Sequence, residues 1–104
     1  MENEVKNGRY VDGSENIRWC KDGKGGKLHR EDGPAYEGIN GTKEWWLNGK
    51  YHREDGPAIE WADGSKFWFL NGIEYTEELY NKIQLNKKLH QTLEEKPSEK
   101  KVKI

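Results

Sequence analysis

Apolar and polar residues alternate over short stretches between residues 8 and 75. In residues 57–75, PAIEWADGSKFWFLNGIEY, an aromatic run at 65–70 lies between an Asp-Gly pair at 63–64 and an Asn-Gly pair at 71–72. Such pairs between apolar runs are a strong signal for a β-hairpin, because glycine readily takes the positive φ that these turns need. This stretch therefore predicts short strands joined by tight turns.

The same plan repeats along the chain. A shift of 23 residues, the separation of Trp45 from Trp68, also aligns Trp46 with Phe69 and one Leu-Asn-Gly stretch with the other. A period in this range is typical of arrays built from one supersecondary unit. We predict a mainly β fold, an elongated single-layer antiparallel β-meander of hairpin repeats within residues 1–75. The expected copies cover about residues 8–28, 29–51 and 52–75.

Side-chain alternation assigns the aromatic residues to faces of this sheet. Trp45 and Trp68 are expected on one face, and Trp46, Phe67 and Phe69 on the other. Aromatic side chains on both faces exceed what one small core requires, so they are candidates for binding a partner. The candidate binding residues are Trp45, Trp46, Trp61, Trp68, Phe67 and Phe69.

A helical spacing replaces the hairpin pattern near the C-terminus. Thr76 suits the N-cap of a helix, and the two glutamates that follow suit the positive end of its dipole. The positions that recur at helical spacing are Leu79, Ile83, Leu89 and Leu93, together with Tyr80 and Asn86. We predict an amphipathic capping helix over residues 76–96, ended by Pro97, and a basic disordered tail over residues 97–104.

The stretch HREDGPA occurs twice, at 29–35 and at 52–58, where one copy joins the next. Asp-Gly-Pro is typical of turns: the Asp carboxylate bonds the backbone two residues on, glycine takes an unusual φ, and proline starts a strand. The arginines are expected to pair with carboxylates of the same or neighbouring copies. The predicted structural connectors are His29, Arg30, Asp32, Gly33, Pro34, His52, Arg53, Asp55, Gly56 and Pro57.

Two chemical interpretations of this stretch compete with the structural one. A catalytic interpretation uses His52 as a base with Glu54 or Asp55 to orient it, and a metal interpretation combines both histidines with Glu31 and Glu54. Catalysis needs unlike groups that converge on one point, whereas identical strings at a fixed spacing should lie side by side. The metal set has no recognised ligand spacing. We therefore expect no enzyme activity, no metal and no cofactor.

Two further features invite a chemical interpretation. Residues 23–27, GKGGK, lack the spacing of a phosphate-binding P-loop and the helix that follows one, so we expect a flexible hairpin insertion. Cys20 aligns with Trp46 and Phe69 and has no activating partner at a fixed local spacing. We expect a half-buried structural thiol.

The spacing GPAIEWADGSKFWFLNG resembles the MORN repeat and its shorter bacterial and viral variant, over roughly Gly8 to Tyr75. The resemblance implies stacked hairpins in an elongated single-layer sheet that serves as a scaffold or protein-binding surface. The HREDGPA form is similar to repeats in small proteins of bacteriophages and large DNA viruses. The extra residues between His and Gly-Pro depart from the family pattern, which puts the membrane or lipid functions of some members in doubt here.

The composition limits the size of the core, the kinds of partner and the cellular compartment that we expect. Hydrophobic residues make up 32% of the chain and charged residues 36%, too little apolar content for a large core. The net charge of −1 gives no general attraction to nucleic acid or to an anionic membrane. One cysteine fits a reducing compartment, and no stretch reads as a secretory signal or a membrane span. We expect a cytoplasmic protein, in the host cytosol if it is viral, with no membrane partner.

These observations favour a non-enzymatic protein-binding module, because Trp, Tyr and Arg dominate the energetics of protein interfaces. The resemblance implies a more specific function: a small phage protein that binds a host protein, such as a defence protein, and inhibits or redirects it. Open sheet edges and the helix also allow a homo-oligomer.

The alternative is a nucleotide or single-stranded nucleic-acid binder. Aromatic side chains would stack on bases beside Lys43, Lys50 and Lys66. Residues 1–85 carry more acidic than basic side chains, and single-strand binders depend on positive charge. The protein-binding function is therefore the first expectation.

Overall fold

The structure is a computed structural model that describes residues 8–94. The chain forms short strands followed by one helix, α1 (Glu77–Glu94). The strands are β1 (Gly8–Val11), β2 (Ile17–Lys21), β3 (Lys27–Leu28), β4 (Tyr36–Glu37), β5 (Lys43–Glu44), β6 (Trp46–Leu47), β7 (Lys50–Tyr51), β8 (Ile59–Glu60), β9 (Lys66–Leu70) and β10 (Ile73–Tyr75).

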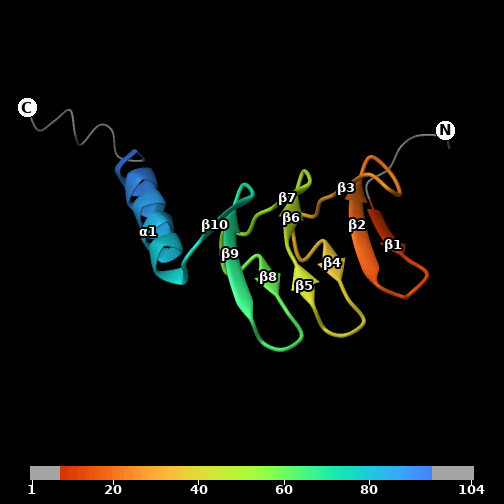
Figure 1. The fold of residues 1–104 in the computed structure, drawn as a ribbon. Coiled ribbons are helices and arrows are strands. Elements are labelled where there is room, and N and C mark those ends of the chain that lie inside the picture. Colours follow the sequence, from red (N-terminus) through yellow and green to blue (C-terminus); the bar gives the residue numbers. More distant parts are fainter. Residues whose placement is uncertain (1–7, 95–104) are drawn as a thin grey trace, which may run out of the picture.

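The strands form a row of hairpins in one layer, with β1 near one end and α1 at the other (Figure 1). An eight-stranded sheet runs in the order β1-β2-β4-β5-β8-β9-β10 with β3 paired to β2, and β6 and β7 form a separate pair. All pairings are antiparallel. The Cα radius of gyration is 18.0 Å, whereas a compact domain of this length has about 13 Å. The predicted elongated antiparallel sheet of hairpins with a C-terminal helix is confirmed.

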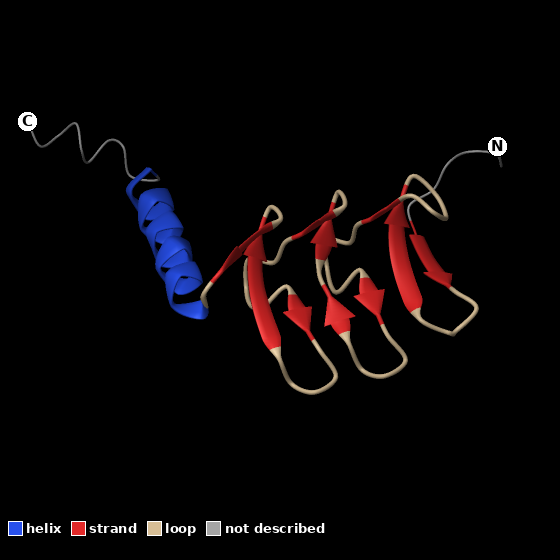
Figure 2. Cartoon of the chain, viewed as in Figure 1, coloured by secondary structure: helices blue, strands red, loops and turns tan. Residues whose placement is uncertain are grey.

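The Asn-Gly turns have the geometry that the sequence predicts. Asn48 and Asn71 both have φ of 52°, and the glycines that follow have φ of 81° and 82°. Two successive positive φ values define the type I′ turn, whose twist matches that of a hairpin. At the opposite end of the hairpins, wider loops contain Gly41 and Gly64, with φ of 100° and 95° (Figure 2).

The HREDGPA connectors leave the sheet and return to the same strand. The backbone N–H of His52 donates to the carbonyl of Trp45 at 3.0 Å, and the N–H of Trp45 donates to the carbonyl of Ala58 at 2.7 Å. One residue of the strand thus holds both ends of the loop between β7 and β8. Trp19 holds both ends of the first connector in the same way, through His29 and Ala35.

The buried residues are few and small, as expected for a sheet without a second layer. Ala35 and Ala58, which close the two connectors, are fully buried. Cys20 is buried, with 4% of its surface exposed, rather than half-buried as the sequence suggested. Residues 23–27 lie mostly in the loop between β2 and β3, where Gly23 and Gly25 have positive φ, as expected of a hairpin insertion.

The helix begins where the sequence predicts. The Thr76 hydroxyl oxygen accepts a hydrogen bond from the Leu79 N–H at 3.2 Å, so Thr76 is the N-cap of α1. The helix packs against β9 and β10. The predicted stripe is wrong in part, because Leu79 and Leu89 are 47% and 55% exposed, whereas Tyr80, which the same spacing includes, is buried. The predicted helix end and the tail over residues 97–104 lie outside the described residues.

Replacement of Gly72 by alanine should destabilise the protein by about 1–2 kcal/mol, because a Cβ raises the energy of the left-handed backbone. The added methyl group itself has room, since Lys50 is the nearest side chain at 3.7 Å. Urea unfolding followed by tryptophan fluorescence measures the change. Gly13→Ala is the matched control: that glycine has no positive φ and open space around it, and we expect little effect. Equal losses at both sites would contradict the turn assignment.

Candidate functional site

In the second connector, Arg53 lies over the ring of Trp45. The guanidinium carbon is 3.7 Å from the ring centroid. Its Nε donates to the Asp55 carboxylate at 2.9 Å, and its Nη1 donates to the Pro57 carbonyl at 3.0 Å and to Glu60 at 3.1 Å. Stacking on an indole together with several charge-assisted hydrogen bonds leaves the arginine a single orientation. We call this arrangement the arginine clamp.

The first connector repeats the arginine clamp with the same atoms. The Arg30 guanidinium carbon is 4.0 Å from the Trp19 ring centroid, and its Nε donates to Asp32 at 2.8 Å. Its Nη1 donates to the Pro34 carbonyl at 3.2 Å and lies 3.5 Å from Glu37. Each arginine therefore pairs with carboxylates of its own copy. The identical sequence carries out the same packing twice.

The clamp also corrects the expected roles of Asp and Gly in the connector. Asp32 and Asp55 hydrogen-bond to the arginine two residues earlier, instead of to the backbone two residues on, and the Arg30 bond lowers the pKa of Asp32 below its usual value. A Cβ on Gly33 would lie 2.9 Å from the Arg30 guanidinium carbon. Glycine is needed here because the arginine passes so close to the backbone.

The connector histidines hold the tight turn of the next hairpin. The Nδ1 atoms of His29 and His52 accept hydrogen bonds from the backbone N–H groups of Asn48 and Asn71, both at 2.9 Å. The other ring nitrogen of His52 lies 3.0 Å from the Glu54 carboxylate, and this contact lowers the pKa of Glu54, with a smaller contribution from a nearby lysine. Each imidazole thus ties the connector at the start of its copy to the Asn-Gly turn at the end of the same copy.

The structure does not gather these groups into a reactive site. His29 contacts Glu31 at 3.4 Å and His52 contacts Glu54, each within its own connector. Within residues 8–94, no three His, Cys, Asp or Glu side chains come together in a way suited to a metal ion.

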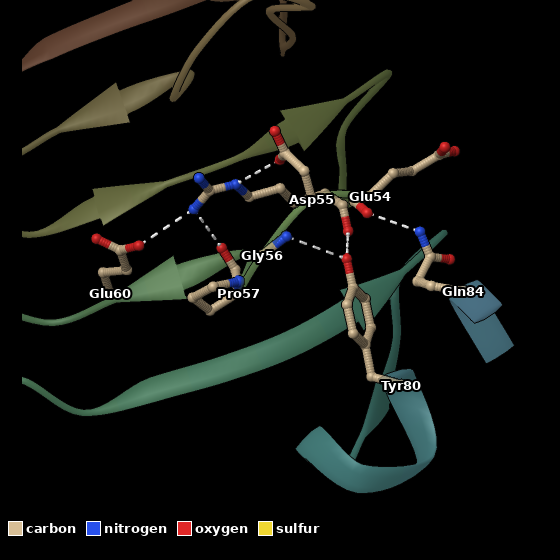
Figure 3. Close-up of polar contacts among 8 residues, drawn as sticks. Glu54, Asp55, Gly56, Pro57, Glu60, Tyr80 and Gln84 are labelled. Carbon is tan, nitrogen blue, oxygen red and sulfur yellow. Dashed lines mark hydrogen bonds and ion pairs between the residues drawn. The ribbon is translucent and has the colours of Figure 1, made fainter. Parts of the chain in front are cut away.

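The helix docks on the second connector through Tyr80 (Figure 3). The Tyr80 hydroxyl donates to the Arg53 carbonyl and accepts from the Gly56 N–H at 3.3 Å. The Gln84 side-chain amide donates to the Glu54 carbonyl at 2.6 Å. Tyr80 is only 2% exposed, and this burial raises its pKa above the ordinary value of 10.0. The connector backbone is therefore a docking site for polar side chains of a helix.

A groove of about 730 Å³ lies between the two connectors. Residues 30–34 of the first connector and 52–55 of the second line it, together with Trp45, Leu47 and three residues of α1. The helix residues are Gln84, Lys87 and Lys88. It is a candidate binding site because it is concave and combines apolar residues with polar backbone.

The opposite face of the sheet carries a row of aromatic rings. The rings of Trp46 and Tyr51 lie 4.0 Å apart between centroids, and those of Tyr51 and Phe69 lie 4.9 Å apart. Trp61 and Phe67 form a second pair at 4.8 Å. Trp46, Tyr51 and Phe69 are half-buried, and Trp61 is 47% exposed. We call these five residues the aromatic face.

The predicted binding residues therefore separate into two groups. Trp46, Phe67 and Phe69 belong to the aromatic face, as does Trp61. Trp45 is covered by Arg53 on the other side. By strand alternation Trp68 shares that side, and β9, the strand that carries it, packs against α1.

Sequence reasoning gave no site role to three residues that the structure brings into these sites, although the predicted helical spacing includes Tyr80. Tyr51 joins Trp46 to Phe69, and Tyr80 and Gln84 attach the helix. A signal for Tyr51 exists, because an apolar residue precedes HREDGPA in both copies. No such signal exists for the two helix residues, since the helix has no repeated counterpart.

Comparison of the chain with protein-family models, curated protein sequences and solved structures gives no match. Within residues 8–94, the helix is not apolar enough to span a membrane.

Arg53→Lys should destabilise the protein by about 1–2 kcal/mol, because lysine cannot stack its head group and make several hydrogen bonds at once. Arg30→Lys, in the equivalent clamp, should have a similar effect. Arg9→Lys is the control, since Arg9 is exposed. Chemical unfolding measures all three. Unchanged stability in both clamp variants would show that the clamps are unimportant.

Tyr80→Phe should destabilise the protein by about 1–3 kcal/mol, because the half-buried Gly56 N–H and Arg53 carbonyl lose their partner. The pKa of Tyr80 is higher in the folded protein than in the unfolded chain, so the neutral phenol stabilises the folded state. This stabilisation is complete below the ordinary pKa of 10.0 and is lost as the pH rises through the raised pKa. Urea midpoints near neutral pH and above pH 10 should therefore differ more for wild type than for Tyr80→Phe. An equal alkaline loss in the two proteins would contradict this assignment.

Proposed function

We propose that this protein is a non-enzymatic protein-binding module that captures its partner on the aromatic face. The observation that carries the proposal is the unbroken ring contact from Trp46 through Tyr51 to Phe69 on one side of a single-layer sheet. Each of these rings keeps part of its surface in solvent. Their packing against each other fixes the rings before any partner arrives.

Such a surface suits protein recognition on energetic grounds. Aromatic side chains bury a large area while losing few rotamers, and hot spots of interfaces are enriched in Trp and Tyr. Trp46 has its indole N–H bonded to Glu44 at 2.9 Å, which orients the ring. Because the rings are already ordered, binding loses less conformational entropy than it would on a flexible loop.

The resemblance to short viral MORN-like repeats supports a particular version of this function. In this version the protein is a small phage protein, and the partner is a host protein, for example a defence protein, that it inhibits or redirects. The compact repeat and the absence of an assembled reactive site among the described residues are consistent with action by binding.

The geometry favours a protein partner over a nucleotide or single-stranded nucleic acid. By strand alternation, Lys43, Lys50 and Lys66 lie on the opposite face from Trp46 and Phe69, so the lysines do not flank the aromatic face. Base stacking needs rings and positive charge on one surface.

The test is affinity capture from a host lysate with tagged full-length protein, the host being the bacterium that supports the source phage. The variant Trp46→Gln with Phe69→Gln should lose a specific protein that the wild type retains. We expect at least a tenfold reduction in recovered partner, because truncating two hot-spot rings costs several kcal/mol.

The matched control is Val11→Gln with Ile39→Gln, which alters two exposed apolar residues outside the aromatic face. Circular dichroism must first show that both double variants are folded. Retention of the same partner by the Trp46 and Phe69 variant would reject the aromatic face as the binding surface, and nucleotide absorbance in the captured fraction would support the alternative.

A further inference from the structure

The groove between the connectors repeats, one copy earlier, the place where α1 docks. Residues that line the groove have counterparts, 23 positions later, around the docked helix. The paired positions are Arg30 and Arg53, Gly33 and Gly56, Trp45 and Trp68, and Leu47 and Leu70. The groove and the helix-docking site are therefore two versions of one structure.

The two versions differ in what fills them. Beside the second connector, Tyr80 is 2% exposed and Leu70 is 8% exposed. The groove beside the first connector is lined by Gln84, Lys87 and Lys88 of α1 but by no tyrosine, and Leu47, the counterpart of Leu70, is only half-buried. The first version stays open as a groove of about 730 Å³.

We propose that this groove binds a tyrosine side chain from a helical segment of a partner protein, in the way that Tyr80 binds the second connector. The site goes beyond the proposed aromatic-face function, because it lies between the connectors, with Trp45 and the Arg53 that covers it in its lining.

The backbone of the first connector offers the same pair of polar groups that hold Tyr80. The second connector presents the Arg53 carbonyl as an acceptor and the Gly56 N–H as a donor. Within the described part of the chain, no protein group hydrogen-bonds to the equivalent Arg30 carbonyl or Gly33 N–H. A phenol hydroxyl serves both, because it donates and accepts at once.

A second contact defines the segment that carries the tyrosine. Gln84 lies one helical turn after Tyr80 and donates to the Glu54 carbonyl. The first connector presents Glu31 at the equivalent position. The fitting segment is thus a helix with a tyrosine and, four residues later, a glutamine, since these positions share one helix face.

The hydrogen-bonding groups of the groove select an unmodified tyrosine, because the charges that line it balance, with four acidic and four basic side chains. Glu31 and Asp32 stand at the first connector with side chains 81% and 85% exposed. Arg30 and Arg53 are held in their clamps, and Lys87 lies 3.7 Å from Glu54. A phosphorylated tyrosine would lack the O–H that the Arg30 carbonyl needs.

The test uses a synthetic peptide with the sequence of residues 77–94, EELYNKIQLNKKLHQTLE, added to the ¹⁵N-labelled full-length protein. We expect saturable shifts of the Gly33 N–H signal in NMR spectra, while the Gly56 signal stays unchanged. A peptide with Phe in place of the tyrosine should bind about fivefold to tenfold more weakly, the usual effect of losing a hydroxyl contact. The phosphotyrosine peptide should bind more weakly still.

The protein variant Leu47→Glu should abolish the shifts, whereas Ile39→Glu, at an exposed site outside the groove, should leave them intact. Equal binding of the Tyr and Phe peptides, or no saturable shift at Gly33, would overturn the proposal. Movement of Gly56 instead would also overturn it, because the peptide would then be exchanging with α1 at the second connector. The Trp46 and Phe69 double variant should bind the peptide normally. The peptide experiment therefore tests the groove proposal independently of the proposal that the aromatic face binds a partner.

Discussion

A single-layer sheet offers an indole ring no second layer to bury it, and the arginine clamp meets this constraint. The connector folds back over its own sheet and lays Arg53 on Trp45, as Arg30 lies on Trp19. A planar guanidinium covers the ring and binds the backbone and carboxylates of the loop at the same time. The path of the connector, the need for glycine within it and the groove beside it all depend on this contact.

The clamps give the two faces of the sheet different surroundings. On one face the chain covers its own tryptophans with connectors, and at the C-terminal end α1 packs on β9 in place of a connector. On the other face, Trp46, Tyr51 and Phe69 contact each other and keep part of their surface exposed. The covered face is polar and shaped by backbone groups, whereas the aromatic face is apolar and continuous. Two surfaces with such different chemistry suit different ligands.

The sequence predicts the hairpins well because turn chemistry is local. Asn-Gly dictates positive φ at both positions, and Thr76 caps the helix whatever lies around it. Strand alternation also separates Trp45 from Trp46 correctly. The contacts of the connector were harder to predict from the sequence. The position of Arg53 over Trp45 depends on how the loop folds back, and residue preferences for helix, strand or turn do not specify that path. The role of Tyr80 was not predicted for a related reason: helical spacing includes Tyr80, but it does not show that the connector backbone binds its hydroxyl.

The connectors also tie each copy to the copy before it. Each arginine rests on a tryptophan of the preceding copy, while each histidine holds the Asn-Gly turn of its own copy. A copy placed between two others therefore finds the partners it needs on either side, and only the terminal helix interrupts the series. Duplication of one unit in the gene would lengthen the sheet and add another groove without redesigning either end, so the length of such an array is free to vary while its local chemistry stays fixed.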